Sequence, residues 1–387
     1  DVLIVLAPKR VADLTWPQEV IDWAPELTYR LLTRDGWDWG DQEVLILNYE
    51  QIGKLVEMVK RTKRFPRAMM VLDECTCARS PRAKRMQTLR PLFKRSKFVY
   101  GLTGTPSPNG YLDLYGQFKW IMAGAEEESP LGTALDRFEL EFFTRGRKKY
   151  AKPVFREEKR DELFRRLEPY FLAQKRSEYL DLPDIEYRDI EISFPRDLMA
   201  KYRELKKNLF ITLDEGEVTA LSAGVLVKKL LQFTSGKIYD EDRIVLDVHD
   251  LKAKAILKIK ERPLLIARDF THSRVPGAVA FDGSKDLIDR WNRKAVNMMI
   301  GHPRSMGIGL NLQKGGNTLV WHTPSYSLMD TQQTESRLHR TGQTKPVIVY
   351  RVIVKGTVDE AVIESLRAKD AGQNALMTAL SYLRRQK

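Results

Sequence analysis

Short apolar runs separated by amphipathic stretches recur along the chain. The first half holds Val2–Leu6, Val44–Leu47, Met69–Leu72 and Phe98–Leu102, and the second half holds Leu264–Ala267, Ala278–Phe281, Val296–Ile300, Thr318–Trp321 and Val347–Val354. Continuous apolar runs of this length are typical of parallel strands that are buried on both faces. The pattern therefore predicts the α/β class, with two parallel sheets.

The segments between the two sets of strands have other patterns. Residues Leu112–Leu180 are charged, lack strand-like runs and predict helices. Ile185–Ser193 alternates apolar and polar residues and predicts a strand with one wet face, so we place the domain boundary near Leu182, between lobes 1–181 and 182–387. Asp197–Phe233 predicts a helical protrusion. Thr357-Val-Asp-Glu opens a C-terminal helix with a capping box, and we expect this helix to brace the second lobe.

Composition narrows the class of protein. A chain of 387 residues suits two domains, and 65 Lys and Arg against 52 Asp and Glu give a net charge of +13. That charge favours a polyanion such as nucleic acid as partner, although it is also compatible with a merely soluble basic protein. Cys75 and Cys77 stand too close for an ordinary disulfide and lack a second pair for zinc, so we expect buried thiols and an intracellular setting. No run is long enough to span a membrane, and no signal peptide is evident.

Two motifs follow strands of the first half. Asp73-Glu74 comes directly after Met69–Leu72, at the strand end where parallel sheets place their ligand sites. One carboxylate can hold Mg²⁺ while its neighbour orients water for attack on a γ-phosphate. Gly101-Leu-Thr-Gly-Thr-Pro106 follows the next run, and its small residues allow close backbone approach. Each motif alone has an ordinary reading as a solvated loop or strand exit, but their order and spacing favour a nucleotide site.

The strongest local signal is Gln333-Thr-Glu-Ser-Arg337-Leu-His-Arg340-Thr-Gly-Gln343. Arg337 and Arg340 lie three apart, so we expect them to share a helix face and to point at one anionic target. The alternative interpretation of this arginine pair is a solvated basic helix face. Upstream, Gly307-Ile-Gly-Leu-Asn-Leu312 supplies a glycine-containing turn that can sit close to a nucleotide or a phosphate backbone.

Taken in order, these motifs resemble the superfamily-two helicases, and their details are similar to the Swi/Snf-related ATPases of phage and bacterial genomes. The resemblance covers nearly the whole chain. The segments that carry it are Ala7–Arg10 with Thr15-Trp16, Asn48-Tyr49, Asp73-Glu74, Thr103–Pro106, Leu231–Gly236, Gly309–Leu312 and Arg337–Gln343.

The resemblance implies two RecA-like lobes with helical insertions that close on ATP and grip DNA. Asp73 would coordinate Mg²⁺, Glu74 would act on the attacking water, and Arg337 and Arg340 would stabilise transition-state charge. The residues expected beside the nucleotide are Gln333, Gly307 and Gly309. Those expected on duplex DNA, without reading its sequence, are Pro8, Lys9, Arg10, Asn48, Tyr49, Thr103, Thr105, Thr271, Ser273 and Asn311.

One part of the family pattern is missing. The phosphate-binding loop Gly-x-x-x-x-Gly-Lys-Ser/Thr occurs nowhere, because Gly53-Lys54 is followed by Leu55 and Gly236-Lys237 by Ile238. We expect that loop upstream of the first strand, so that the first lobe is incomplete at its N-terminus and this chain alone hydrolyses ATP poorly. Two further departures are Cys75-Thr76 in place of the usual motif II ending in His, and a connection Asp269–Pro276 that is short for the helix expected there.

The leading hypothesis is therefore an ATP-driven motor on duplex DNA, in the cytoplasm of a bacterial or phage-infected cell. A DNA-binding clamp with a defunct nucleotide site is the alternative from another class, and the missing loop supports it. An RNA helicase is disfavoured by the Arg-Leu-His-Arg-Thr-Gly-Gln form of the last motif. The seven tryptophans are expected to pack in cores, at Trp16, Trp23, Trp37, Trp39, Trp120, Trp291 and Trp321.

Overall fold

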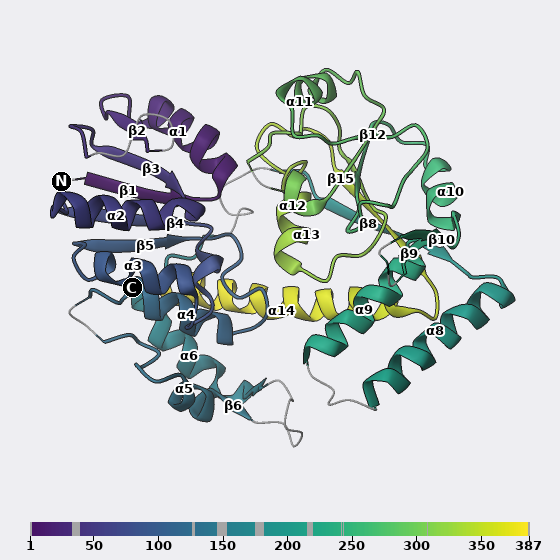
Figure 1. Cartoon of the computed structure of the whole chain (residues 1–387), viewed down its shortest axis with the longest axis horizontal. Coiled ribbons are helices and arrows are strands. Elements are labelled where there is room, and N and C mark those ends of the chain that lie inside the picture. The colour runs from purple at the N-terminus through teal and green to yellow at the C-terminus, as the bar shows by residue number, and fades with distance from the viewer. Residues whose placement is uncertain are drawn as a thin grey trace. The chain divides into compact units, whose positions relative to one another are not determined.

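The computed structural model of the chain describes residues 2–32, 39–125, 128–144, 153–174, 182–214, 220–240, 242, 244–307 and 309–385, without the side chains of 209–214, 220–224 and 373–385. The chain divides into two compact units (Figure 1). The first comprises residues 1–175 with 371–387, and the second comprises residues 176–370. The boundary expected near Leu182 stays a prediction, because residues 175–181 lie outside the described residues.

The first unit is built on a parallel sheet in the order β2-β3-β1-β4-β5. Its strands are β1 (Val2–Ala7), β2 (Tyr29–Leu31), β3 (Val44–Asn48), β4 (Ala68–Asp73) and β5 (Phe98–Leu102). Val5 of the central strand faces Ile46 on one side and Val71 on the other. The first four apolar runs therefore form parallel strands, as predicted.

Helices cover both faces of this sheet. A π-helical turn (Val11–Thr15) and α1 (Trp16–Trp23) pack on the face that includes Val5 and Ile46. The opposite face is covered by α2 (Ile52–Thr62), α3 (Lys84–Phe93) and part of α4 (Leu112–Ile121). Burial of continuous strands between two helical layers is the arrangement that their uninterrupted apolar sequences favour.

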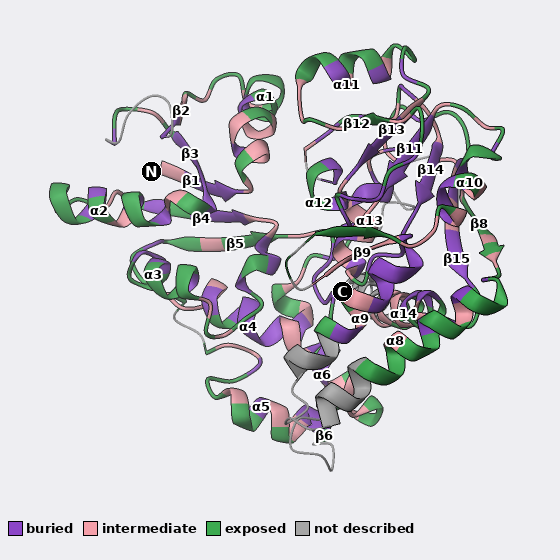
Figure 2. Cartoon of the chain, turned by 45° about the vertical axis from the view of Figure 1, so that its right-hand side comes forward, coloured by how far each residue is buried: buried purple, intermediate pink, exposed green. Residues whose placement is uncertain are grey.

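Strand β5 departs from the predicted burial. Phe98, Tyr100 and Leu102 are each about half exposed, and Figure 2 shows the strand largely in the exposed colour. The reason is position: β5 ends the sheet and, among the described residues, pairs with β4 alone. Its apolar sequence is that of a covered strand, but no described helix covers the face that carries these three side chains.

The segment Leu112–Leu180 was predicted to be helical throughout, and this is wrong in part. Besides α4 it contains α5 (Leu135–Phe142) and α6 (Arg160–Leu167), together with a hairpin of β6 (Phe143–Thr144) and β7 (Val154–Phe155). Aromatic packing favours the hairpin, because the Phe143 ring lies 5.7 Å from Phe138 and 5.5 Å from Phe155. Residues 145–152 and 175–181 of the segment lie outside the described residues.

The second unit contains a parallel sheet in the order β12-β13-β11-β14-β15-β8. Its strands are β8 (Ile185–Ile192), β11 (Leu264–Ala267), β12 (Val279–Ala280), β13 (Met298–Gly301), β14 (Thr318–Trp321) and β15 (Val347–Val354). The predicted fold class, α/β with two parallel sheets, is confirmed. The connection after β11 holds no helix, which agrees with its short sequence.

Helices surround this sheet and extend from it. They are α8 (Arg196–Asp214), α9 (Ala220–Thr234), α10 (Leu251–Leu257), α11 (Lys285–Asn292), α12 (Pro303–Met306), α13 (Leu328–Glu335) and α14 (Val358–Arg385). A hairpin of β9 (Lys237–Tyr239) and β10 (Val245–Asp247) follows α9. Helix α14 begins in the second unit, whereas its residues from Ala371 belong to the first. None of the described helices is long and apolar enough to cross a membrane.

The predicted capping box of α14 is present in altered form. The Glu360 carboxylate accepts from the backbone N–H of Gly356 over 3.1 Å, one residue before the expected Thr357. Thr357 Oγ1 accepts from Asp359 N over 3.4 Å and donates to Val354 O. The side chain of Asp359 also accepts from Val354 N, so the start of the helix is fixed by several partners.

Four of the tryptophans are buried as predicted, Trp39, Trp120, Trp291 and Trp321, and Trp16 is partly buried. Trp37 lies outside the described residues. The prediction is wrong for Trp23, which is 81% exposed because it stands at the end of α1, whose buried side chains are Pro17 and Val20.

Candidate functional site

Asp73, the last residue of β4, stands at the carboxyl edge of the first sheet and is held by two donors. Its Oδ2 accepts from Trp16 Nε1 over 2.9 Å, and its Oδ1 accepts from the backbone N–H of Glu74 over 2.9 Å. Burial raises the pKa of Asp73, while these two hydrogen bonds lower it. The carboxylate is therefore partly desolvated but fixed in orientation.

Glu74 adopts a left-handed backbone conformation, with φ 52° and ψ 53°. A non-glycine residue in this region costs on the order of 1–2 kcal/mol, and such strain concentrates at functional sites. The turn redirects the chain directly after β4 into a 3₁₀ turn (Cys75–Ala78). The left-handed turn therefore lies at the second residue of the acidic pair, directly after Asp73.

Two further residues predicted to bind DNA lie beside this acidic pair. Tyr49 is buried and donates from its hydroxyl to the carbonyl oxygen of Asp73 over 2.6 Å. Asn48, also buried, caps the following 3₁₀ turn (Tyr49–Gln51) by accepting from Glu50 N over 3.0 Å. Tyr49 therefore supports the position of Asp73, and Asn48 fixes the turn that carries Tyr49.

The loop after β5 is connected to the acidic pair through Gln117 of α4. Gln117 is buried, its Nε2 donates to Pro106 O over 2.6 Å, and its Oε1 accepts from Cys75 Sγ over 3.3 Å. Thr103 Oγ1 accepts from Thr105 N over 3.0 Å, and Thr105 Oγ1 is buried without a partner among the described residues. Through its thiol Cys75 thus joins the acidic pair to Gln117. Cys77, predicted to be buried, is exposed.

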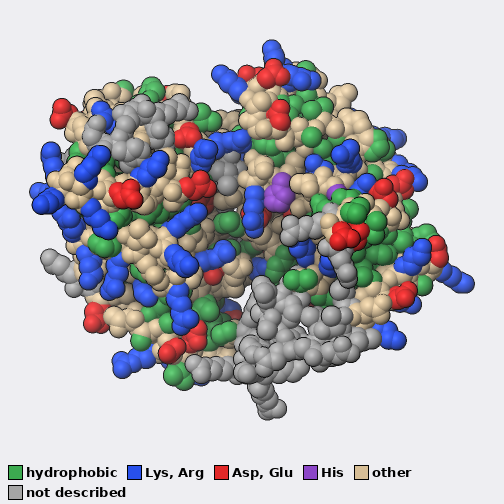
Figure 3. All heavy atoms as spheres, in the orientation of Figure 1, with side chains coloured by type: hydrophobic (Ala, Val, Ile, Leu, Met, Phe, Trp, Pro, Cys, Tyr) green, Lys and Arg blue, Asp and Glu red, His purple; other side chains and the backbone are tan. Residues whose placement is uncertain are grey.

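The predicted motif Ia residues occupy the turn after β1. Pro8 O accepts from Ala12 N over 2.9 Å, which starts the turn towards α1. Lys9 is exposed and Arg10 partly exposed. Lys and Arg side chains outnumber Asp and Glu on the displayed faces of both units (Figure 3), in line with the net charge of +13.

The second unit holds the predicted arginines in a turn instead of on a helix face. Helix α13 ends at Glu335, so Arg337 and Arg340 lie in the irregular segment that follows it, and the expected shared helix face is wrong. Their guanidinium groups nevertheless converge, since Nη1 of each donates to Leu310 O, over 3.3 and 3.0 Å. Arg337 Nε also donates to Gln333 O over 3.0 Å.

The glycine-containing turn lies directly beside these arginines. A Cβ on Gly307 would meet Pro303 O at 2.7 Å, and Gly309 has a φ of +63°, so both positions favour glycine. Asn311 is exposed, and its carbonyl accepts from Asn292 Nδ2 over 2.9 Å. Gly307, Gly309, Gln333, Arg337 and Arg340 are therefore brought together in one part of the second unit.

Buried polar residues hold this arginine segment in place. Glu335 accepts from Trp321 Nε1 over 3.1 Å and from the Tyr187 hydroxyl over 2.8 Å, and burial raises its pKa to about 7. Gln343 donates to the carbonyls of Gln313, Gly316 and Leu338. The sequence motif contained both residues, but nothing in their spacing indicated these partners.

Thr271 and Ser273, from the loop after β11, differ in exposure. Thr271 is exposed, whereas Ser273 is 1% exposed and its hydroxyl has no partner among the described residues. Arg268 donates to the carbonyl oxygens of both residues and fixes the loop. A contact of Ser273 with DNA would require this loop to open.

The site can be tested for its fit to Mg²⁺ and ATP. Each oxygen of Asp73 retains a lone pair, and Mg²⁺ commonly binds one or two carboxylates with substrate phosphates and waters, so Asp73 fits that role. The described residues contain no cluster of three His, Cys, Asp or Glu that could form an all-protein metal cage. For the β- and γ-phosphates, the sequence contains no Gly-rich loop ending in Lys-Ser/Thr.

Comparison with known proteins gives consistent matches. The model of the SNF2-related domain matches residues 2–235. Protein p41 of Acyrthosiphon pisum secondary endosymbiont phage 1 is 30% identical over 420 residues, covering 97% of this chain and 88% of that protein. The ATP-dependent helicase MG018 of Mycoplasma genitalium is 24% identical, and the CHD3-type chromatin-remodeling factor CHR7 of Arabidopsis thaliana is 23% identical.

These last two matches cover 91% and 92% of this chain but only 35% and 32% of the respective relatives. Among solved structures, the Sulfolobus solfataricus SWI2/SNF2 ATPase core in complex with dsDNA aligns with a TM-score of 0.40 at 20% identity, covering 100% of this chain and 84% of that one. Because the domain model matches more than half of the sequence and the phage protein aligns along nearly all of it, this chain belongs to the SNF2-related family.

Proposed function

We propose that this chain is the core of an ATP-driven motor that moves along duplex DNA. Family membership supports the proposal, and relatives are named as ATP-dependent helicases and chromatin-remodeling ATPases. The observation that carries it is the fixed orientation of the Asp73 carboxylate, directly before Glu74, at the carboxyl edge of a parallel sheet.

In this proposal each polar residue has one task. Asp73 holds Mg²⁺, which supplies charge neutralisation at the phosphates when it is bound. Glu74 orients and deprotonates the attacking water, and Arg337 and Arg340 stabilise the charge that develops in the transition state. Gln333, Gly307 and Gly309 lie beside the nucleotide in this proposal, because Gln333 O accepts from Arg337 and both arginines donate to Leu310 O, directly after Gly309.

DNA binding is proposed for the exposed loop residues. Lys9, Arg10, Thr103, Thr271 and Asn311 are exposed or partly exposed and can contact phosphates without reading sequence. Pro8, Thr105 and Ser273 belong to the same loops, whereas Asn48 and Tyr49 stand at the end of β3. Asn48, Tyr49, Thr105 and Ser273 are buried, and we propose that they position the loops.

Movement would come from closure of the two lobes on ATP and their reopening after hydrolysis, a coupling that turns phosphate chemistry into steps along DNA. We propose translocation without strand separation. The protein would act at DNA in bacterial or phage-infected cells, in keeping with its phage relative.

The missing phosphate loop favours a second candidate function. Without the loop's lysine and amides, the β- and γ-phosphates have few ligands, so the chain by itself could serve as a DNA-binding clamp. If the chain is a clamp, its affinity for DNA should be the same with and without ATP. The motor requires turnover once a phosphate loop is supplied.

ATP hydrolysis with and without duplex DNA tests the proposal. The chain would be compared with a version that carries a phosphate-binding loop joined upstream, and with Glu74→Gln in that version. We expect DNA-stimulated turnover in the extended wild type alone. Absence of turnover in every version, with DNA binding intact, would overturn the motor and favour the clamp. RNA in place of DNA provides the control for substrate class.

A further inference from the structure

Exposed cations gather at the amino edge of the first sheet, the edge opposite the acidic pair. Because β4 and β5 are parallel neighbours, the loops that lead into them both lie at this edge. The cations of these two loops are all exposed. They are Lys63, Arg64 and Arg67 before β4, and Lys94, Arg95 and Lys97 before β5. We call the surface that these six side chains form the basic edge.

Contacts between the two loops hold the basic edge together. Lys97 N donates to Ala68 O over 2.8 Å, where β5 begins beside β4. The guanidinium carbon of Arg95 lies 5.2 Å from the centroid of the Phe65 ring, and the ring of Trp39 meets the same ring edge-on at 5.9 Å. The two sets of cations therefore lie side by side on one fixed surface.

The positive charge of the basic edge is not neutralised by neighbouring carboxylates. In the part of the chain that the structure describes, five of the six cations make no ion pair: Lys63, Arg64, Lys94, Arg95 and Lys97. The sequence explains this, since neither Met58–Leu72 nor Cys75–Leu112 contains an Asp or a Glu. Figure 3 shows Lys and Arg side chains along the left margin of the first unit, where Figure 1 places the start of β1 and the end of α2.

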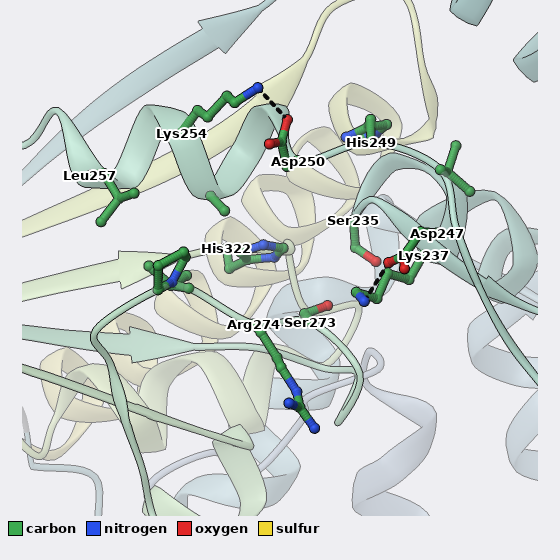
Figure 4. A pocket seen from close by; sticks show the side chains of 14 residues that line it. Ser235, Lys237, Asp247, His249, Asp250, Lys254, Leu257, Ser273, Arg274 and His322 are labelled. Carbon is green, nitrogen blue, oxygen red and sulfur yellow. Dashed lines mark ion pairs between the residues drawn. The ribbon is translucent and has the colours of Figure 1, made fainter.

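Cations elsewhere in the chain are compensated. In the cavity of the second unit that Figure 4 shows, Lys237 is paired with Asp247 and Lys254 with Asp250. The basic edge therefore differs from this surface in the absence of such pairs among the described residues, and not merely in its number of cations.

Helix ends account for only part of this charge. Lys63 and Lys94 directly follow α2 and α3, where a cation complements the helix dipole. Arg67 and Lys97 instead stand directly before β4 and β5, beyond the last helical turn to which that effect is confined. Like charges that gather on one surface repel each other, so this arrangement favours an anionic partner.

We propose that the basic edge binds a second segment of duplex DNA, separate from the duplex on which the motor is proposed to move. A duplex carries one negative charge per about 1.7 Å of its axis, so it offers phosphates to both loops whatever its sequence. An acidic protein would have to place a carboxylate opposite each cation. Duplex DNA is therefore the partner that this surface fits best.

The position of the basic edge makes the two duplexes distinct. In the first unit, the residues proposed for the motor's DNA stand at the carboxyl ends of β1, β3 and β5. Strand β4 separates the two edges by six residues, or about 17–20 Å. One chain thus bridges two DNA segments. The second site needs no ATP turnover, so it goes beyond the proposed motor function.

A capture assay with two duplexes, the whole chain and no ATP tests the proposal. A duplex of about 20 base pairs, or two helical turns, is immobilised and loaded with the chain, and a fluorescent duplex of another sequence is then added. We expect the wild type to retain the second duplex. The triple variant Arg64→Gln, Lys94→Gln and Lys97→Gln should still bind the immobilised duplex. It should retain the second about tenfold less, because three phosphate contacts are lost.

The matched control removes the same charge from exposed positions of the second unit. Its substitutions are Lys260→Gln, Lys285→Gln and Arg293→Gln. Because the two triple variants have the same net charge, a general effect of charge would weaken retention in both. We expect the control to retain the second duplex like the wild type.

Four outcomes would overturn the proposal. A wild type that binds the immobilised duplex but retains no second one lacks the second site, which leaves the proposed motor untouched. Equal retention by the wild type and the basic-edge variant places the bridge elsewhere, including between two copies of the chain. Stronger displacement of the second duplex by poly-L-glutamate than by unlabelled duplex, at equal charge, assigns the surface to an acidic polypeptide. Failure to bind even the immobilised duplex contradicts the proposed function as well.

Discussion

The guanidinium groups of Arg337 and Arg340 donate to one carbonyl oxygen, that of Leu310, over 3.3 and 3.0 Å. Neither arginine is on a helix, so this shared acceptor replaces helical spacing as the feature that aligns them. Arg337 is held further by its Nε, which donates to Gln333 O over 3.0 Å. The arginines are therefore oriented before any nucleotide binds.

We predict that Arg340→Ala lowers ATP turnover by about a thousandfold or more in a version with a phosphate loop, because it removes transition-state charge stabilisation. DNA binding and the unfolding midpoint should stay close to those of the wild type, since Leu310 O retains Arg337. Single-turnover hydrolysis measures the effect, and Arg293→Ala, at an exposed position after α11, is the control. If Arg340→Ala turns over ATP as fast as the wild type, Arg340 is not a catalytic residue.

A second prediction concerns Gln117, which links Cys75 to Pro106. Gln117→Leu should reduce the stimulation of turnover by DNA about tenfold and should destabilise the protein by about 1–3 kcal/mol, since Pro106 O loses its donor in a buried place. Comparison of stimulated with basal turnover, at a temperature where the variant is folded, separates coupling from stability. Gln87→Leu, at an exposed position of α3, is the matched control. If DNA stimulates turnover in Gln117→Leu as strongly as in the wild type, the role of Gln117 is limited to packing.

The strands of both sheets could be predicted from sequence because continuous apolar runs have few alternatives in an α/β chain. Long-range contacts could not. Trp16 and Asp73 are 57 residues apart, and no periodicity relates an indole N–H to that carboxylate. Gln117 is a single amide on a helix, a pattern that most often indicates a solvated position, yet it is buried between two motifs.

Errors arose where tertiary packing overrode local pattern. The spacing of Arg337 and Arg340 predicts a helix face, but α13 ends at Glu335. Charged sequence after Leu112 predicts helices, but the ring of Phe143 packs beside Phe138 and Phe155 and a hairpin forms. Strand β5 is as apolar as a central strand, but it lies at the exposed edge of the sheet. Its sequence alone does not distinguish an edge strand from a central one.

The pH dependence of stability follows from Glu335. Its folded-state pKa, about 7, lies above the ordinary value of 4.5 because of burial. Between those values the folded state binds more protons than the unfolded one, so the stability of the wild type falls as pH rises from 4.5 through 7. Glu335→Gln keeps an acceptor for Trp321 and can donate to the Tyr187 hydroxyl. It should therefore be more stable than the wild type at pH 8, by on the order of 2 kcal/mol.

Urea unfolding of wild type and Glu335→Gln at pH 5 and pH 8 measures this difference. We expect nearly equal midpoints at pH 5, where the carboxyl is protonated, and a higher midpoint for the variant at pH 8. A variant that is less stable than the wild type at pH 8 would show that the ionised carboxylate is favourable in its site.

The buried ion pair of Lys252 and Asp359 provides a prediction about stability. Both side chains are fully buried, 2.6 Å apart, and Asp359 also accepts from Thr234 Oγ1 and Val354 N. Lys252→Met leaves a buried carboxylate without its cation and should cost about 3–5 kcal/mol. Lys254→Met, on the same helix but exposed in a pair with Asp250, should change stability by less than about 1 kcal/mol. Equal losses in denaturant unfolding would contradict the assigned role of the buried pair.

Lys9 gives the most direct test of DNA contact. It is exposed in the turn after β1, and a phosphate contact there would release counterions on binding. Lys9→Gln should therefore weaken binding to every duplex sequence alike, and should reduce the slope of log affinity against log salt by about 0.9. Fluorescence anisotropy across a salt series measures both, with Lys285→Gln on α11 as control. A slope that Lys9→Gln leaves unchanged would place the DNA elsewhere, whereas a loss confined to one sequence would mean that this turn reads bases and that binding is not sequence-independent.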